Sequence, residues 1–220
     1  MNEAEITAWV KANKKSLVDK IIGAAEPQAQ PIAVIMAGIP GAGKTEFLSH
    51  ITPGVDGMVV IDLDVIVAKM PNYRPEEYYK YRKAANIIIP SVLTKVLKNK
   101  INFALDGTFS HTKGAENIER ALNHGYEVNL FFVGQEPELA WEITRARRLL
   151  TGRPIERAGF IKACHNVVPN VRDAIEKFRD NSNFFVSIIK KDNLNKYDYL
   201  DDHTRVDNYL KEVYNRHYHE

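Results

Sequence analysis

The sequence predicts an α/β fold in which a parallel β-sheet is flanked by helices on both faces. Two observations predict it. Apolar runs of strand length alternate with helical patterns along the chain, as in βαβ units, whose strands pair in parallel. Most of these runs are apolar throughout, which is typical of strands that helices cover on both sides.

The N-terminal part of the chain is expected to begin with a helix. Apolar side chains recur at helical spacing over residues 3–22, at Ile6, Trp9, Val10, Leu17 and Ile21. Two prolines then break the pattern before the apolar run 32–36, which is the first expected strand. A helix over residues 44–50 and a second strand over residues 58–62 follow.

The middle of the chain continues the alternation. Residues 75–98 have a helical pattern, with Pro90 expected to kink the helix or to divide it in two. A third strand over 101–105 is closed by Asp106 and Gly107, and a helix over 112–123 ends near Gly125.

The C-terminal part contains the last two expected strands, 126–133 and 184–189. Between them lie helical patterns over 138–150 and 156–180, and a polar helix is expected over 203–217. The length of 220 residues favours one domain. It comprises an N-terminal helical segment (1–30), a core (31–190) and a polar C-terminal segment (191–220).

The composition is that of a globular protein. Hydrophobic residues make up 45% and charged residues 26%, which excludes a disordered or fibrous chain. The net charge of +2 gives no general affinity for nucleic acid or for an anionic membrane, so neither is expected as a partner. Cys164 is the single cysteine, the first residues are acidic, and no apolar run approaches membrane-spanning length. A cytoplasmic location is therefore expected.

Residues 38–45 match the phosphate-binding pattern G-x-x-x-x-G-K-[ST] in full, between a strand and a helix. Glycines let successive N–H groups turn inward around an anion, and the following helix adds its positive end. Lys44 is expected to reach the β and γ phosphates, and the Thr45 hydroxyl to bind Mg²⁺. The match predicts a P-loop NTPase-type fold that binds a nucleoside triphosphate together with Mg²⁺. The expected nucleotide-binding residues are Gly38, Gly41, Ala42, Gly43, Lys44, Thr45 and Glu46.

Two acids close the second strand. Asp62 and Asp64 are two residues apart, so on a strand their side chains would point the same way. A kinase needs a carboxylate to accept the proton of the attacking hydroxyl, and Asp64 is the candidate. Asp62 is a candidate second acid near Mg²⁺ or the substrate. The alternative is that both are ordinary strand-end or helix-capping acids.

A third acid, Asp106, follows the apolar run 103–105. In that position it resembles a Walker-B acid that holds Mg²⁺ through water, and a substrate ligand or a turn residue before Gly107 are the alternatives. Thr108 and Ser110 are candidate hydroxyl contacts.

Residues 141–157 are rich in arginine: Arg145, Arg147, Arg148, Arg153 and Arg157. Guanidinium groups stabilise the negative charge of phosphoryl transfer, and small kinases often bring them in on a helical lid. Gly152-Arg153-Pro154 interrupts the helical pattern, as a lid loop would. The alternative is a solvated helix face, particularly for Arg147 or Arg148.

The segment 195–198 spells N-K-x-D, a guanine-binding pattern of GTPases. No D-x-x-G occurs anywhere in the chain, and the segment does not end an apolar strand, so we interpret the match as chance. The seven histidines lack the spacing of a zinc site.

With these residues placed, the chain resembles the zeta-toxin family of P-loop kinases over residues 30–170. The resemblance depends on the order of several motifs: Gly38–Thr45, Val60-Ile61-Asp62-Leu63-Asp64, Met70-Pro71-Asn72-Tyr73, Leu105-Asp106-Gly107-Thr108, and the arginine segment that ends near His165.

The resemblance implies a function. Zeta toxins use ATP and Mg²⁺ to phosphorylate the 3′-hydroxyl of the sugar in UDP-N-acetylglucosamine, and they belong to toxin–antitoxin systems. It implies that Asp64 is the catalytic base and that Asp106 and Thr108 contact the substrate. Arg145 and Arg157 would contact the phosphates, with Arg153 as a rival for the latter.

Two positions depart from the family. Asp106 stands where the family usually has Glu, and Ser110 stands where an arginine is common. Both lie on the acceptor side. Alternative functions are therefore a small P-loop kinase for another hydroxyl acceptor (a nucleoside, an antibiotic or a polynucleotide end), or a non-catalytic ATP-binding partner of an antitoxin.

Overall fold

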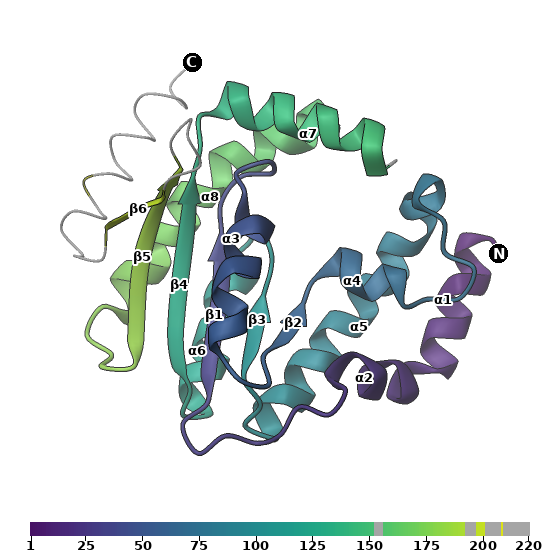
Figure 1. Ribbon diagram of the computed structural model, residues 1–220, viewed down its shortest axis with the longest axis horizontal. Coiled ribbons are helices and arrows are strands. Elements are labelled where there is room, and N and C mark those ends of the chain that lie inside the picture. Colours follow the sequence, from purple (N-terminus) through teal and green to yellow (C-terminus); the bar gives the residue numbers. More distant parts are fainter. Residues whose placement is uncertain (152–155, 192–196, 201–207, 209–220) are drawn as a thin grey trace.

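Among the residues that the computed structural model describes (1–151, 156–191, 197–200 and 208), six strands form one sheet in the order β2-β3-β1-β4-β5-β6 (Figure 1). The strands are β1 (Ile32–Ala37), β2 (Val59–Ile61), β3 (Phe103–Leu105), β4 (Glu127–Gly134), β5 (Phe184–Lys191) and β6 (Tyr197–Leu200). The first five are parallel, and β6 pairs antiparallel with β5. Ile35 of β1 lies opposite Leu105 on one side and Leu130 on the other. The predicted parallel α/β sheet is confirmed.

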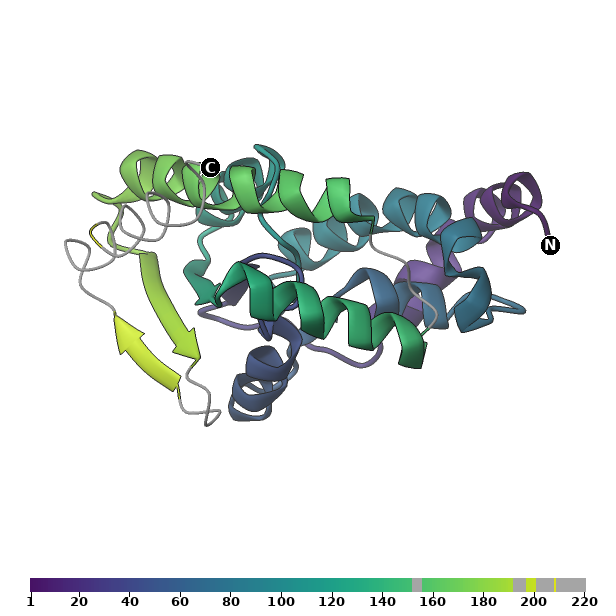
Figure 2. The same cartoon turned by 90° about the horizontal axis from the view of Figure 1, so that it is seen from above.

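Eight α-helices surround this sheet within the described ranges. They are α1 (Glu3–Ala12), α2 (Lys14–Ile22), α3 (Lys44–Ile51), α4 (Leu63–Ala68), α5 (Tyr78–Lys98), α6 (Lys113–Asn123), α7 (Pro137–Thr151) and α8 (Arg157–Phe178). Helix α3 covers one face, while α5, α6 and α8 cover the other (Figure 2). Helix α7 crosses above the carboxyl ends of the strands (Figures 1 and 2). No helix in the described part is long and apolar enough to cross a membrane.

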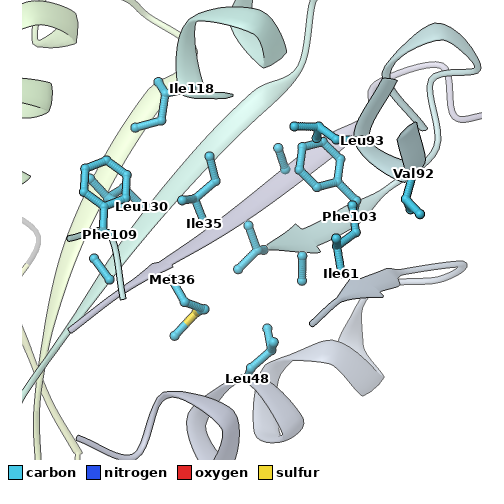
Figure 3. Packing of buried hydrophobic residues seen from close by; sticks show 14 of the residues in the cluster. Ile35, Met36, Leu48, Ile61, Val92, Leu93, Phe103, Phe109, Ile118 and Leu130 are labelled. Atoms are coloured by element: carbon cyan, nitrogen blue, oxygen red, sulfur yellow. The ribbon is translucent and has the colours of Figure 1, made fainter. Parts of the chain in front are cut away.

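Alternate residues of β1 serve the two layers, as the pleat of a strand requires. Met36 points toward Leu48 of α3, and Ile35 points to the opposite face, where Ile118 of α6 lies (Figure 3). All four side chains belong to one buried apolar cluster. The sheet is therefore buried on both faces, which explains its continuous apolar strands.

The N-terminal segment departs from the single helix expected over residues 3–22. Helices α1 and α2 are separated at Asn13, whose φ of −105° and ψ of 15° lie outside the helical range. Asn has a low helix propensity, and its amide here donates a hydrogen bond to the Trp9 carbonyl, 2.9 Å away. The break lets both helices pack against α5, beyond the edge of the sheet at β2 (Figure 1).

Two further helices bear on the predictions. Helix α5 continues through Pro90, which is exposed, so the helix is not divided in two there. Its buried face extends on both sides of the proline through residues such as Ile88 and Val92. Helix α4 was not expected. It begins directly after Asp62, which caps it, so the second strand ends at Ile61.

At the C-terminal end, strand β6 was not expected, since it lies in a polar stretch. Of the N-K-x-D segment, residues 195 and 196 lie outside the described ranges, and Asp198 belongs to β6 opposite Lys190. The polar helix expected over 203–217 also lies outside them, apart from residue 208.

Candidate active site

The predicted phosphate-binding residues form the turn between β1 and α3. Gly43 immediately precedes α3 and has a φ of 93°, a left-handed conformation that favours glycine. The Lys44 side chain is 9% exposed, and its Nζ donates to the Ile39 carbonyl at 2.8 Å. Helix α3 begins directly after this turn, at the carboxyl end of β1, which is the arrangement that binds phosphate at a helix N-terminus.

Thr45 and Asp106 lie side by side at this edge. The Thr45 hydroxyl donates to Asp106 Oδ2 at 2.8 Å. The Asp106 N–H in turn donates to the Ile61 carbonyl at 3.1 Å, which fixes the acid between β2 and β3. Hydroxyl and carboxylate oxygens suit Mg²⁺, which is usually held by one or two carboxylates together with phosphate oxygens. In the described residues no cluster of three or more His, Cys, Asp or Glu is placed to hold a metal, so such an ion would depend on the nucleotide as well.

Asp62 caps helix α4. Its Oδ1 accepts hydrogen bonds from the N–H groups of Asp64 at 2.7 Å and Val65 at 2.9 Å. Burial raises the pKa of Asp62 above its ordinary value; the Val65 N–H opposes the shift, and the carboxylates of Asp64 and Asp106 add to it. Asp62 is therefore a helix-capping acid, which was the alternative given for it from the sequence. Asp62 follows β2, Asp106 follows β3 and Asp64 lies in the first turn of α4, so the three acids lie near one edge of the sheet.

Asp64 lies in the first turn of α4 and not on a strand. The strand argument for its direction is therefore wrong, although the residue still lies near the other two acids. Its Oδ2 is 3.5 Å from Nη2 of Arg147, which reaches down from α7. From the sequence, the alternative for Arg147 was a solvent-exposed helix face, because nothing in the pattern distinguishes it from the neighbouring arginines.

The other arginines occupy different positions. Arg145 pairs with Glu142 on the same helix at 3.0 Å, and Arg157 lies over the Trp141 ring, 5.2 Å from its centroid. Arg153, the loop around it and the side chain of Arg148 lie outside the described part. The described structure thus brings Arg147 to Asp64. Arg145 lies on the same helix, α7, and Arg157 begins α8 and packs on Trp141 of α7.

The segment after Asp106 forms a fixed loop beside the P-loop. The Gly38 N–H donates to the Thr108 carbonyl at 3.2 Å, and the hydroxyls of Thr108 and Ser110 are 2.8 Å apart. Between them Phe109 is buried with a φ of 62°, which is unusual for a bulky residue. The Asn170 amide donates to its carbonyl at 3.1 Å. The hydroxyls of Thr108 and Ser110, the two predicted contacts, therefore lie together in the loop beside the P-loop.

Three supporting residues were missed in the sequence. Asn170 of α8 holds the Phe109 carbonyl, and Gly114 of α6 leaves room for the Phe109 ring. Thr144 of α7 is buried beside Gly41. None belongs to a motif. Asn170 and Thr144 act on residues far away in the chain, and Gly114, although close to Phe109 in sequence, lies against a ring whose position no local pattern signals.

Comparison with known proteins identifies the family of this chain. A family model described as Zeta toxin matches residues 16–202. The chain is 28% identical over 197 residues to Toxin PezT of Streptococcus pneumoniae serotype 4 (strain ATCC BAA-334 / TIGR4), and the match covers 84% of this chain and 78% of that protein.

Solved structures share the fold. A chain in the PezAT chromosomal toxin–antitoxin system of Streptococcus pneumoniae superposes with a TM-score of 0.66 at 21% identity, covering 100% of this chain and 90% of that one. A chain of AvrRxo1-ORF1:-ORF2 with ATP also gives 0.66 at 11% identity, covering 94% and 71%. Since the family match spans most of the sequence, the chain belongs to the zeta toxin family of P-loop kinases.

Proposed function

We propose that this kinase transfers the γ-phosphate of ATP to a sugar hydroxyl of a nucleotide sugar such as UDP-N-acetylglucosamine. The observation that carries the proposal is the position of Asp64. Asp64 lies in the first turn of α4, directly after β2, at the edge of the sheet that also bears the P-loop and the Thr45–Asp106 pair. Its Oδ2 is 3.5 Å from Nη2 of Arg147. This position supports a role for Asp64 as the proton acceptor for a hydroxyl that approaches the nucleotide.

The residues divide the task between them. The N–H groups of the P-loop and Lys44 bind the phosphates, and Asp64 orients the acceptor hydroxyl and takes its proton. Arginine neutralises charge on the transferred group. The family resemblance favours Arg145 and Arg157, with Arg153 as an alternative to Arg157. The ion pair between Arg147 and Asp64 makes Arg147 a further candidate.

The donor set fits Mg²⁺. Thr45 and Asp106 would hold the ion, and Asp62 is a further candidate, although one of its oxygens caps α4. Bound Mg²⁺ neutralises phosphate charge. The protein residues contribute the orientation: Asp106 is fixed by its hydrogen bond from the backbone, and Thr45 by the first turn of α3.

The acceptor side is formed by Asp106, Thr108 and Ser110. Two paired hydroxyls and a carboxylate suit a ligand rich in hydroxyl groups, such as a sugar. Ser110 replaces the arginine common in the family, so this site offers the acceptor's diphosphate one cationic contact fewer. We therefore expect the protein to bind the nucleotide part of the acceptor more weakly than its sugar.

The first experiment incubates the protein with ATP, Mg²⁺ and UDP-N-acetylglucosamine and detects, by mass spectrometry, a product heavier by one phosphoryl group. Asp64→Ala should reduce formation of this product by about 10² to 10⁴-fold, the usual contribution of a general base. Its affinity for ATP should stay within a few-fold. Asp173→Ala on the exposed face of α8 is the matched control and should leave turnover unchanged.

The outcomes separate the alternatives. Turnover that survives in Asp64→Ala would exclude this residue as the base and turn attention to Asp62. ATP binding without the expected product would exclude this acceptor, and a panel of nucleosides, aminoglycosides and polynucleotide ends would follow. ATP binding without transfer to any of them would favour the non-catalytic ATP-binding alternative.

We further propose an antitoxin partner and a cytoplasmic location. Support comes from the PezAT relative, which is described as a toxin–antitoxin system, and from the single cysteine, Cys164, which is buried. Co-expression with the protein encoded next to this one should give a stable complex in which turnover is suppressed. A partner that neither co-purifies nor inhibits would contradict the proposal.

A further inference from the structure

Thr144 is a buried polar side chain without an evident task in the fold. It is 5% exposed, and with Lys44 and Asn102 it makes up the buried polar or charged side chains of the described part. Lys44 donates to the Ile39 carbonyl, and the Asn102 side chain bonds to the Ile32 N–H and the Asp56 carbonyl. The Thr144 hydroxyl has no hydrogen-bond partner among the described residues.

This hydroxyl faces the P-loop. A Cβ atom placed on Gly41 would lie 2.7 Å from Thr144 Oγ1 and 2.1 Å from the Ala140 carbonyl oxygen. Helix α7 therefore lies directly on Gly41, whose φ of 80° and lack of a side chain both permit this approach.

The surrounding helix does not satisfy the hydroxyl. A threonine inside a helix ordinarily returns its hydrogen bond to the carbonyl four residues earlier, here that of Ala140. That carbonyl faces Gly41 as well, yet no such bond forms. A buried hydroxyl without a partner costs free energy, and a valine of the same shape would avoid the cost. Its position beside the P-loop points to a partner that arrives with the ligand.

The face of α7 that holds Thr144 also serves the active site at a second point. Ala140, Thr144 and Arg147 follow one another at four and three residues, so they lie on one stripe of the helix. Ala140 contacts the P-loop at one end of this stripe, and Arg147 pairs with Asp64 at the other. Thr144 is between them, above the turn that would bind phosphate.

We propose that the Thr144 hydroxyl donates a hydrogen bond to a phosphate oxygen of ATP held at Gly41. This inference rests on the proposed function only through ATP and is independent of the acceptor. It makes α7 a part of the nucleotide site through a neutral donor, in addition to the arginines. The bond is formed to a charged acceptor, which makes its loss measurable.

The test compares Thr144→Val, which keeps the shape and removes the hydroxyl, with Thr144→Ser, which keeps the hydroxyl. ATP with Mg²⁺ is titrated calorimetrically into each protein in the absence of an acceptor. The valine variant should bind ATP about tenfold more weakly, and the serine variant within about threefold of wild type. Without ATP, Thr144→Val should melt at or above the wild-type temperature, because the buried unpaired hydroxyl is gone.

Two results would overturn the inference. Wild-type affinity in Thr144→Val would mean that the hydroxyl does not contact the nucleotide. A fall in affinity with an equal fall in melting temperature, unrescued by serine, would assign the residue to packing alone. If wild type binds ATP and the sugar nucleotide is not phosphorylated, the acceptor fails and this inference stands. If wild type does not bind ATP, both fail.

Discussion

Arg147 reaches Asp64 across the edge of the sheet, with Nη2 3.5 Å from Oδ2. The contact joins α7, which crosses above the carboxyl ends of the strands, to α4, which follows the second strand (Figure 1). It makes the candidate base and a candidate charge-neutralising group neighbours, although the sequence separates them widely. Phosphoryl transfer requires both groups near the reacting phosphate.

Replacing this arginine should therefore affect turnover much more than stability. Arg147→Ala is expected to lower kcat by about 10 to 10³-fold, as arginine contributions to phosphoryl transfer are large. The melting temperature should change little, since both side chains are partly exposed and such ion pairs contribute little to folding. Steady-state kinetics and thermal melts of the same preparation check both points.

Arg145→Ala is the matched comparison on the same helix. Arg145 pairs with Glu142 and its side chain is 62% exposed. A loss of turnover confined to Arg147→Ala would assign the phosphate contact to that residue. A loss confined to Arg145→Ala would support the assignment by family resemblance and make the Asp64 pair incidental.

Asp62 gives a pH-dependent prediction. Burial raises its pKa above the ordinary 3.8, so the folded protein holds this proton more tightly than the unfolded chain. Stability should then fall as the pH rises from about 4 through the raised pKa, because only the unfolded chain ionises freely in that range. Asp62→Asn keeps an oxygen for the α4 cap and removes the charge. It should be more stable than wild type at pH 8 and equal to it near pH 4.

Urea unfolding at a series of pH values measures this difference. Asp62→Ala, which also removes the cap, should be less stable than Asp62→Asn by about 1 kcal/mol at every pH. Asp173→Asn on the exposed face of α8 should show no pH-dependent gain. If the gain in the free energy of unfolding of Asp62→Asn were the same at every pH, ionisation of the Asp62 carboxyl would not destabilise the folded protein.

The strands and the P-loop could be predicted because their signals are local. Apolar runs define β1 to β5, and the glycine spacing of residues 38–45 defines the phosphate turn. Helix α4 was missed because an acid after a strand and an acid that caps a helix look alike in sequence. The break at Asn13 was missed because its apolar pattern continues across it, and the need to pack against α5 decides the geometry.

The motif residues of the candidate site can be recognised in the sequence, but the residues that contact them cannot. The sequence identifies Thr45, Asp64 and Asp106 by type and position. Which arginine meets Asp64 depends on how α7 rotates as it crosses the sheet, and spacing along a helix alone does not fix that. The roles of Asn170 and Gly114 depend on the unusual backbone of Phe109, for which the sequence carries no signal.

Gly114 allows a test of the acceptor loop. A Cβ at this position would lie 2.4 Å from the ring of Phe109, which is buried and cannot yield easily. Gly114→Ala should therefore destabilise the protein by about 1–3 kcal/mol, despite the better helix propensity of alanine. Movement of Phe109 should also shift Thr108 and Ser110, so the KM for the acceptor should rise more than the KM for ATP.

Gly159→Ala in α8 is the control, since no atom lies within 4 Å of its added Cβ. This change should stabilise the protein by about 0.5–1 kcal/mol and leave both KM values unchanged. Equal stabilisation by both substitutions would show that the Phe109 ring moves aside freely. In that case the loop is not held by α6.

Asp106 is the residue whose role is most open to a direct measurement. As a magnesium-holding acid it acts through its charge, whereas as a sugar ligand it acts through its hydrogen bonds. Asp106→Asn keeps an oxygen that can accept the Thr45 hydroxyl bond and removes the charge. We expect the Mg²⁺ concentration for half-maximal turnover to rise about tenfold or more, since carboxylates are preferred ligands of this ion.

Asp56→Asn on an exposed loop is the control and should leave the Mg²⁺ dependence as it is. An unchanged Mg²⁺ dependence together with a raised KM for the sugar nucleotide would assign Asp106 to the acceptor instead, because loss of charge would then matter less than loss of an acceptor oxygen.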